Sequence, residues 1–209
     1  MKDIKQGIKV IDLSADYRIK NVELWQKVYG RKHTSPEYIE KAVYGIPELH
    51  REEIKDASLI ANPGCFSSAA LLGLAPLMQI KNINKSDITV IGLSGSSGVG
   101  ADLDIVAHHP ELHNNIVPYN VVGHRHTYEI EQELQLLTDE TVRVHFTPAY
   151  VPVTREILNI CSITYEGNLS IDDLKMIYQE FYKNDEFVKI LNYEKEEKVS
   201  WQYKPYPWV

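Results

Sequence analysis

One of the two cysteines of the chain, Cys65, directly follows an Asn-Pro-Gly sequence and opens a run of small and apolar residues in ANPGCFSSAALLGLAPL (61–77). Because a Pro-Gly pair forms a tight turn, the strand-like residues before it must end there, and a new helix can begin at Cys65. The unpaired N–H groups and the positive dipole end of a first helical turn favour a thiolate over a thiol. The pattern therefore predicts a nucleophile, and the alternative is a buried cysteine that acts as a small hydrophobe.

Acidic and basic side chains converge in GHRHTYEIEQEL (123–134), where a helix is predicted over 127–137. His124 and Arg125 stand at the start of this helix, and Glu129 falls in its first turn. A cysteine nucleophile needs a group that takes or returns a proton, and a histidine oriented by a carboxylate can do this. His124 with Glu129 is therefore predicted as such a pair, and the alternative is a solvated helix start.

Three other stretches could bind a ligand. Arg155 interrupts an apolar stretch, and its guanidinium could hold a carboxylate or a phosphate, or face water from an edge strand. A predicted strand runs into GSSGVG (95–100), which is too rich in glycine for a helix interior and would let the backbone approach a ligand. The polar residues of DLSADYR (12–18) end another predicted strand, where α/β sheets bind ligands, but an Asp-Arg structural pair explains them equally well.

No metal site is predicted from the histidines in the middle of the chain. His108, His109 and His113 lie close together in sequence, but no acid or cysteine at ligand spacing completes a set. The second cysteine, Cys161, lies within a strand pattern and is expected to fill the core.

The elements that must position these residues alternate between strands and helices. Apolar runs and alternation predict strands over 8–13, 58–62, 87–95, 142–147 and 156–165. Periodicity and capping predict helices over 35–43, 66–78 and 127–137, and a further helix whose capping box is formed by Ser170 and Asp173. Residues 192–209 are charged and then aromatic, and we expect them to form a tail.

Size and composition are those of an ordinary globular protein, since 44% of the 209 residues are hydrophobic. A net charge of −7 with interspersed signs argues against a nucleic acid or an anionic membrane as partner. No apolar stretch reaches about 18 residues, and the N-terminus has no signal-peptide core, so a cytoplasmic protein is expected. Two distant cysteines are typical of reduced thiols rather than of a disulfide framework.

Six stretches together resemble the N-acetyl-gamma-glutamyl-phosphate reductase family, the semialdehyde-forming enzymes of arginine biosynthesis. They are KVIDLSADYR, AVYGIPELHREEI, ANPGC, GLSGSSGVG, GHRHTYEIEQEL and FTPAYVPVTREIL, in family order. The resemblance implies an α/β remnant of a dinucleotide-binding domain followed by an α+β catalytic domain with a mixed sheet, as in glyceraldehyde-phosphate dehydrogenases. The implied boundaries are 1–64 for the partial nucleotide-binding domain, 65–191 for the catalytic and dimerisation domain, and 192–209 for the tail.

The resemblance also implies NADPH-dependent reductive dephosphorylation of N-acetyl-gamma-glutamyl phosphate, without a metal. The Cys65 thiolate would displace phosphate, and hydride from NADPH would reduce the resulting thioester to an aldehyde. His124 would act as general acid/base, Glu129 would orient it, and a homo-dimer or homo-tetramer is the implied assembly. The other implied site residues are Arg125 and Arg155 for the substrate's carboxylate or phosphate, and Gly95, Ser97 and Gly98 for the nicotinamide.

The chain departs from the family pattern at two places. Phe66-Ser67-Ser68 stands where the family often has Tyr-Pro-Thr. The family's glycine-rich strand-turn-helix unit, which cradles the dinucleotide's pyrophosphate, would lie upstream of residue 1, and GSSGVG lacks its spacing. We therefore expect these 209 residues to bind NADPH weakly.

Three other functions stay open. The related reductase of lysine biosynthesis would act on an acyl phosphate one carbon longer. A cysteine hydrolase would use Cys65, His124 and Glu129 with water in place of hydride. A non-catalytic assembly module would keep only the dimer-forming sheet.

Overall fold

The computed structural model of the chain describes residues 4, 7–101 and 104–191. The chain divides into two compact units, Met1–Gly167 and Asn168–Val209, which are described separately. The predicted tail, 192–209, lies outside the described residues. No helix among the described residues is long and apolar enough to cross a membrane.

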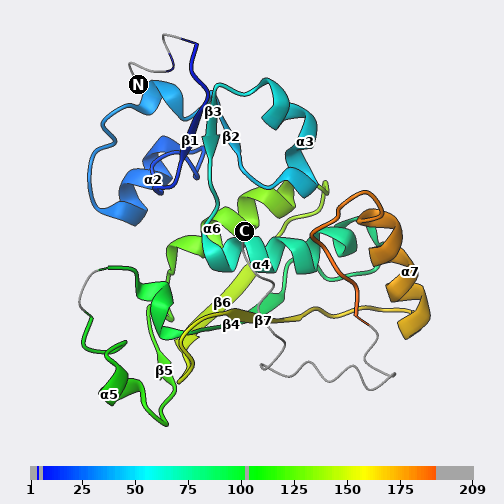
Figure 1. Cartoon of the computed structure of the whole chain (residues 1–209). Helices are drawn as coiled ribbons and strands as arrows, with labels where there is room; N and C mark the ends of the chain where they lie inside the picture. The colour runs from blue at the N-terminus through cyan, green and yellow to red at the C-terminus, as the bar shows by residue number, and fades with distance from the viewer. Residues whose placement is uncertain (1–3, 5–6, 102–103, 192–209) are drawn as a thin grey trace. The chain divides into compact units, whose positions relative to one another are not determined.

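A small parallel sheet forms the beginning of the first unit (Figure 1). Its strands are β1 (Val10–Asp12), β2 (Ala42–Tyr44) and β3 (Leu59–Ala61), with β3 between the other two. The helices α2 (Val22–Tyr29) and α3 (Pro47–Asp56) lie in the connections between the strands. Strands were predicted at the positions of β1 and β3, and both predictions are confirmed.

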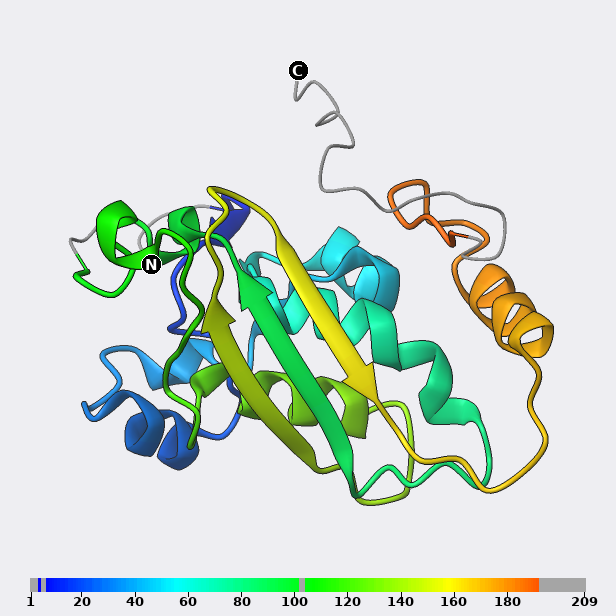
Figure 2. The ribbon, with the colours of Figure 1, turned by 90° about the horizontal axis from the view of Figure 1, so that it is seen from below.

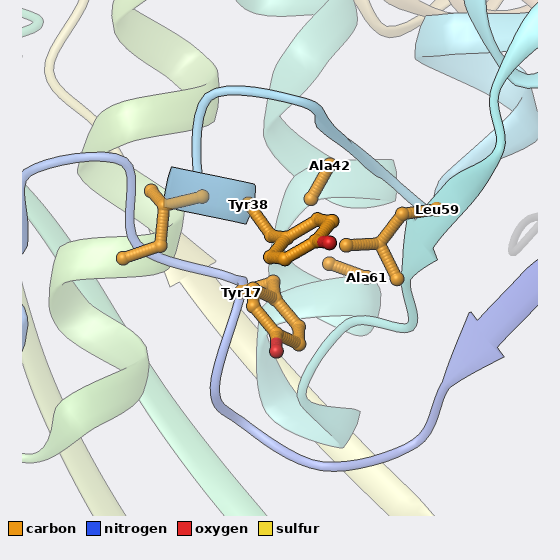
Figure 3. Close-up of a cluster of buried hydrophobic side chains, with 6 residues drawn as sticks. Tyr17, Tyr38, Ala42, Leu59 and Ala61 are labelled. Atoms are coloured by element: carbon orange, nitrogen blue, oxygen red, sulfur yellow. The ribbon is translucent and has the colours of Figure 1, made fainter. Parts of the chain in front are cut away.

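Two tyrosine rings and a set of small and aliphatic side chains pack beside this sheet (Figure 3). The buried members of the cluster are Tyr17, Tyr38, Ile39, Ala42, Leu59 and Ala61. They come from the loop after β1, the turn before β2, and the two strands β2 and β3. Burial of this apolar area stabilises the small parallel sheet.

The prediction of a helix over 35–43 is wrong. Only the short 3₁₀ helix η1 (Pro36–Tyr38) forms there, and Ala42–Tyr44 is strand β2, paired with β3. Ser35 does not cap a helix, because its hydroxyl is hydrogen-bonded to the Tyr17 hydroxyl at 2.7 Å. The local sequence favours a helix, but strand pairing and the burial of alternate side chains stabilise a strand instead. The sequence pattern does not reveal this pairing.

A mixed four-stranded sheet forms the rest of the first unit, which confirms the fold class implied by the resemblance. Its order is β5 (Val117–Pro118), β6 (Val144–Tyr150), β4 (Ile88–Ser94) and β7 (Ile157–Ser162). Strand β4 is parallel to β6 and antiparallel to β7. Of the three long strands, each lies within or overlaps a predicted strand.

Two helices, α4 (Cys65–Leu74) and α6 (Arg125–Gln135), pack together on one face of the mixed sheet (Figure 2). Helix α4 continues into the 3₁₀ helix η2 (Ala75–Gln79), and together they cover the helix predicted over 66–78. The opposite face of the sheet carries no helix of the described residues 7–101 and 104–167 (Figure 2). Helix α5 (His109–Leu112) is a single short turn in the connection between β4 and β5.

The second unit contains helix α7 (Ile171–Phe181). Its predicted capping box is confirmed, because the Asp173 N–H donates to the Ser170 hydroxyl and the Ser170 N–H donates to the Asp173 carboxylate. These bonds from Ser170 lower the pKa of Asp173.

Candidate active site

Cys65 is the first residue of α4, as predicted, and its side chain is exposed. The exposure excludes the alternative of a buried core cysteine. The residue follows β3 by a short turn, at the edge where the three parallel strands end. Ligands in α/β sheets bind at this carboxyl edge, so the thiol stands where a substrate can reach it.

The turn before Cys65 is packed tightly against helix α6. A Cβ atom on Gly64 would lie 2.3 Å from the His126 Nε2 atom, so only glycine leaves room for that imidazole. The Gly64 N–H donates to the Glu129 Oε2 atom at 3.0 Å. The position of the cysteine is therefore tied to the beginning of α6, which also carries the candidate acid/base histidine.

His124 is the N-cap residue of α6, and its Nδ1 atom accepts a hydrogen bond from the His126 N–H at 3.1 Å. The ring is 5% exposed and stands edge-on to aromatic neighbours, including Phe66 at 6.1 Å and Phe146 at 5.1 Å between ring centroids. Since Phe66 is the residue after Cys65, His124 packs against the first turn of α4, the turn that begins at Cys65.

Burial keeps His124 neutral. It lowers the pKa of His124 to about 4, and the positive charge of Arg125 adds to the effect. Because Nδ1 accepts the His126 N–H, the neutral ring carries its proton on Nε2. His124 therefore presents an N–H donor rather than a free base in this conformation.

Tyr119 and Tyr150 belong to the same site, although the sequence analysis did not single them out. Their rings stack at 4.2 Å, and the Tyr119 ring lies 5.8 Å from the His124 ring. Burial is the main cause that raises the pKa of both phenols, and the nearby Cys65 raises each further. Tyr150 lies within the stretch FTPAYVPVTREIL, but that stretch does not show that Tyr150 meets Tyr119, because strand pairing between β5 and β6 brings the two residues together.

Glu129 is fully buried. It was predicted in the first turn of the helix, but α6 begins at Arg125, so Glu129 is the first residue of the second turn. Its Oε2 atom accepts from the Tyr44 hydroxyl at 2.7 Å as well as from Gly64. The Arg18 guanidinium lies 3.7 Å from Oε1. Among the described residues these groups, rather than His124, are its hydrogen-bond and charge partners. The His126 ring, whose pKa burial lowers to about 2, is neutral and only lies near Glu129, with its Nε2 atom 3.9 Å from Oε1.

The two predicted substrate arginines both have exposed side chains. Arg125 follows His124 at the first position of α6, and Arg155 lies in the loop before β7. A Cβ atom on Gly95 would lie 2.7 Å from the Arg155 backbone nitrogen, so the glycine loop and the Arg155 loop are in close contact. The structure thus brings these two predicted ligand-binding segments together.

The loop after β4 forms one turn of 3₁₀ helix, η3 (Ser96–Val99), within the predicted glycine-rich loop. Its amides are already used: Ser96 and Ser97 donate to backbone carbonyls of the Arg155 loop, and Gly98 donates to Gly95. The amides therefore do not form a free anion cradle. The Ser97 side chain is exposed and can contact a ligand.

The polar residues after β1 serve different purposes. Asp16 pairs with Arg31 at 2.8 Å, so the Asp-Arg pair within 12–18 that was considered as an alternative does not form between Asp16 and Arg18. Arg18 instead is buried and donates to the Asn62 carbonyl at 2.7 Å, directly before the Pro-Gly turn. No group of three histidine, cysteine or acidic side chains within the described ranges could hold a metal ion.

Two family models match the chain. The semialdehyde dehydrogenase dimerisation domain matches residues 65–204, and the semialdehyde dehydrogenase NAD binding domain matches residues 2–57. Among solved structures, aspartate semialdehyde dehydrogenase II from Vibrio cholerae is similar with a TM-score of 0.59 at 16% identity, over 84% of this chain and 54% of that chain. This likeness supports the fold alone.

Curated relatives are closer in sequence. The N-acetyl-gamma-glutamyl-phosphate reductase of Moorella thermoacetica is 42% identical over 90% of this chain and 54% of its own length. That of Methanocella arvoryzae is 46% identical, again over 90% of this chain and 54% of its own length. The chain thus spans about half the length of the curated relatives it matches. On its site, its fold and these identities, the chain belongs to the N-acetyl-gamma-glutamyl-phosphate reductase family of semialdehyde dehydrogenases.

Proposed function

We propose that the chain carries the catalytic part of an NADPH-dependent reductase that converts N-acetyl-gamma-glutamyl phosphate to the semialdehyde, in arginine biosynthesis. The observation that carries the proposal is the exposed Cys65 at the start of α4, packed through Phe66 and Gly64 against the helix that begins at His124. Membership of the reductase family supports the choice of substrate.

In the first step, the Cys65 thiolate attacks the acyl carbon of the acyl phosphate, which is a mixed anhydride of a carboxylic acid and phosphoric acid. A carbon–sulfur bond forms, the bond from the acyl carbon to the phosphate oxygen breaks, and phosphate leaves with the electron pair. The thiol proton is lost to solvent, because the side chain is exposed. The product of this half-reaction is a thioester on Cys65.

His124 stabilises the charge that develops on the substrate oxygen. Its neutral ring offers the Nε2 hydrogen, and burial among aromatic rings makes such a hydrogen bond stronger than in water. Of the predicted general acid/base role, His124 thus performs the acid part, as a hydrogen-bond donor. The exposed guanidiniums of Arg125 and Arg155 are suited to hold the substrate's carboxylate or phosphate.

The NAD binding domain model over 2–57 supports a nicotinamide cofactor, and we propose NADPH. When bound, NADPH would supply the hydride that reduces the thioester on Cys65. The described loop at Gly95–Gly98 fits the nicotinamide end only through its Ser97 side chain and its close-packed backbone, because its amides are used within the chain. We propose the same domain division as predicted, with residues 1–64 on the nucleotide side and residues 65–191 on the catalytic side.

The acyl-transfer half-reaction tests this function without the cofactor. Incubation with N-acetyl-gamma-glutamyl phosphate should release one phosphate per chain in a burst and add the acyl mass to the Cys65 peptide, as measured by phosphate assay and mass spectrometry. The acyl phosphate one carbon longer should react more slowly. Faster reaction of the longer substrate would favour the lysine-pathway reductase, continuous turnover would favour a hydrolase, and no release at all would contradict the proposal.

We propose that the open face of the mixed sheet pairs with a second copy of the chain. Apolar side chains on that face are exposed: Ile91 by 40%, Leu158 by 39% and Ile160 by 47%. The dimerisation-domain model over 65–204 supports a homo-oligomer.

Replacing Ile160 by lysine is expected to convert a dimer to a monomer, because it places a charge in the middle of the buried face. Light scattering coupled to size-exclusion chromatography measures the mass. Lysine at exposed Leu136, at the end of α6 on the other face of the sheet, is the control and should leave the mass unchanged. A dimer that persists in the Ile160 variant would contradict this interface.

A further inference from the structure

We propose that Tyr44 and Arg18 are positioning residues for Cys65, acting through Glu129 as a buried anchor of the Asn62-Pro63-Gly64 turn. The proposal rests on the proposed function, since it concerns how the nucleophile is held for attack. It assigns Glu129 to the nucleophile's backbone rather than to the imidazole of His124.

Glu129 is 0% exposed, and burial of a carboxyl group is costly unless hydrogen-bond donors or positive charge compensate it. Two donors converge on a single oxygen: the Tyr44 hydroxyl at 2.7 Å and the Gly64 N–H at 3.0 Å. The guanidinium of Arg18 lies near the other oxygen at 3.7 Å. The carboxylate therefore links the end of β2, the residue before the cysteine and the loop after β1.

Arg18 also holds the other end of the turn. Its Nε atom donates to the Asn62 carbonyl at 2.7 Å, and the Asn62 N–H donates to the Asp12 carbonyl at 2.9 Å. The His126 ring closes the third side, at the place where a Gly64 side chain would stand. The three residues before Cys65 are thus fixed by contacts from β1, the Arg18 loop and α6.

Helix α6 therefore fixes the positions of both Cys65 and His124. Glu129 and His126 fix the backbone before Cys65, and His124 begins the same helix. A rigid α6 holds the sulfur and the imidazole in one geometry, and attack on a bound carbonyl requires such alignment. Loosening the anchor should slow acyl transfer from bound substrate without weakening substrate binding.

The first measurement is amide hydrogen exchange at Gly64 by NMR, compared with the amides of β4 as a reference for global stability. Tyr44→Phe removes one donor from Glu129, and protection of Gly64 should fall at least tenfold while β4 stays protected. Glu129→Gln keeps an oxygen for the Gly64 N–H and should retain most of the protection. Tyr17→Phe removes a tyrosine hydrogen bond to Ser35 in the same unit and is the matched control.

The second measurement is the rate of Cys65 acylation by the acyl phosphate. Tyr44→Phe should lower the rate at saturating substrate about tenfold with half-saturation unchanged, and Glu129→Gln should stay within about threefold of the parent. Unchanged acylation in Tyr44→Phe would overturn the positioning role, whatever the exchange result. Glu129→Ala removes the acceptor altogether and serves as the reference for loss of the anchor. If Glu129→Gln is acylated as slowly as Glu129→Ala, the positioning role is overturned, and the negative charge of Glu129 acts on a histidine instead.

The two measurements separate this proposal from the proposed function. If the parent chain is not acylated, the proposed function fails, and Gly64 exchange still tests whether Tyr44 and Glu129 hold the turn. If the parent is acylated and Gly64 remains protected in Tyr44→Phe, the anchor alone fails. Arg18→Met, which removes the donor to Asn62, should deprotect Gly64 in the same way as Tyr44→Phe.

Discussion

Replacing Cys65 by serine is expected to abolish the burst of phosphate from N-acetyl-gamma-glutamyl phosphate, with a loss of at least about a thousandfold. A serine hydroxyl is not ionised at neutral pH, and His124 cannot activate it, because its burial and its bond from the His126 N–H leave a proton on Nε2. The helix start itself tolerates serine, so the fold should be kept. Phosphate release and the mass of the peptide that contains residue 65 are the measurements.

Cys161→Ser is the matched control for this experiment. Cys161 lies in β7, and burial raises the pKa of its thiol to about 11, so it is not ionised at neutral pH. The variant should release phosphate at the parental rate and carry the acyl group on Cys65. Acylation of the Cys65→Ser variant at the parental rate would contradict the covalent mechanism, and acyl mass on Cys161 would reassign the nucleophile.

The features that the sequence predicts well are those with local causes. A Pro-Gly pair ends β3 and starts α4 at Cys65, and Ser170 with Asp173 starts α7, because capping and turn preferences act over a few residues. The helix predicted over 127–137 forms as α6, but it begins at Arg125 with His124 as its N-cap, which was not predicted. The turn before Cys65 and the capping box of α7 could be stated from the sequence alone.

The features that it misses depend on contacts between distant segments. Glu129 meets Tyr44 and Gly64, which are 85 and 65 residues away, so the role of this carboxylate is visible only in the folded chain. The stacking of Tyr119 on Tyr150 requires β5 to pair with β6. The failed helix over 35–43 has the same origin, because β2 is stabilised by its pairing with β3 rather than by its own residues.

The buried histidines and the anchor together explain why the motif around residue 124 is dense in polar residues. In the proposed mechanism His124 faces the bound substrate, while His126 fills the space left by Gly64 and Glu129 accepts a hydrogen bond from the Gly64 N–H. Adjacent residues of one helix thus carry separate tasks. A sequence pattern shows that these residue types are together, but their directions follow from how α6 packs on α4.

The stability of the fold is expected to fall steeply in mild acid, because His124 and His126 are buried as neutral rings. Burial lowers the pKa of His124 to about 4 and, with the charges of His124 and Arg125, that of His126 to about 2, against an ordinary value of 6.5. Below pH 6.5 the unfolded chain binds protons at these sites that the folded chain does not, so the free energy of unfolding decreases as pH falls. From pH 7 to pH 5 the loss should be roughly 3 kcal/mol for the two rings. Urea unfolding at the two pH values measures it.

His124→Asn isolates one ring, because asparagine keeps the N-cap acceptor for the His126 N–H. Its loss of stability between pH 7 and pH 5 should be about half that of the parent. Replacing His145, whose side chain is 68% exposed, by glutamine is the control and should leave the pH dependence unchanged. His50 does not produce the same effect: its hydrogen bond to Glu133 raises the pKa of His50, so its contribution is lost as pH rises through that value, not as it falls. An unchanged acid loss in His124→Asn would show that His124 is not buried as a neutral ring.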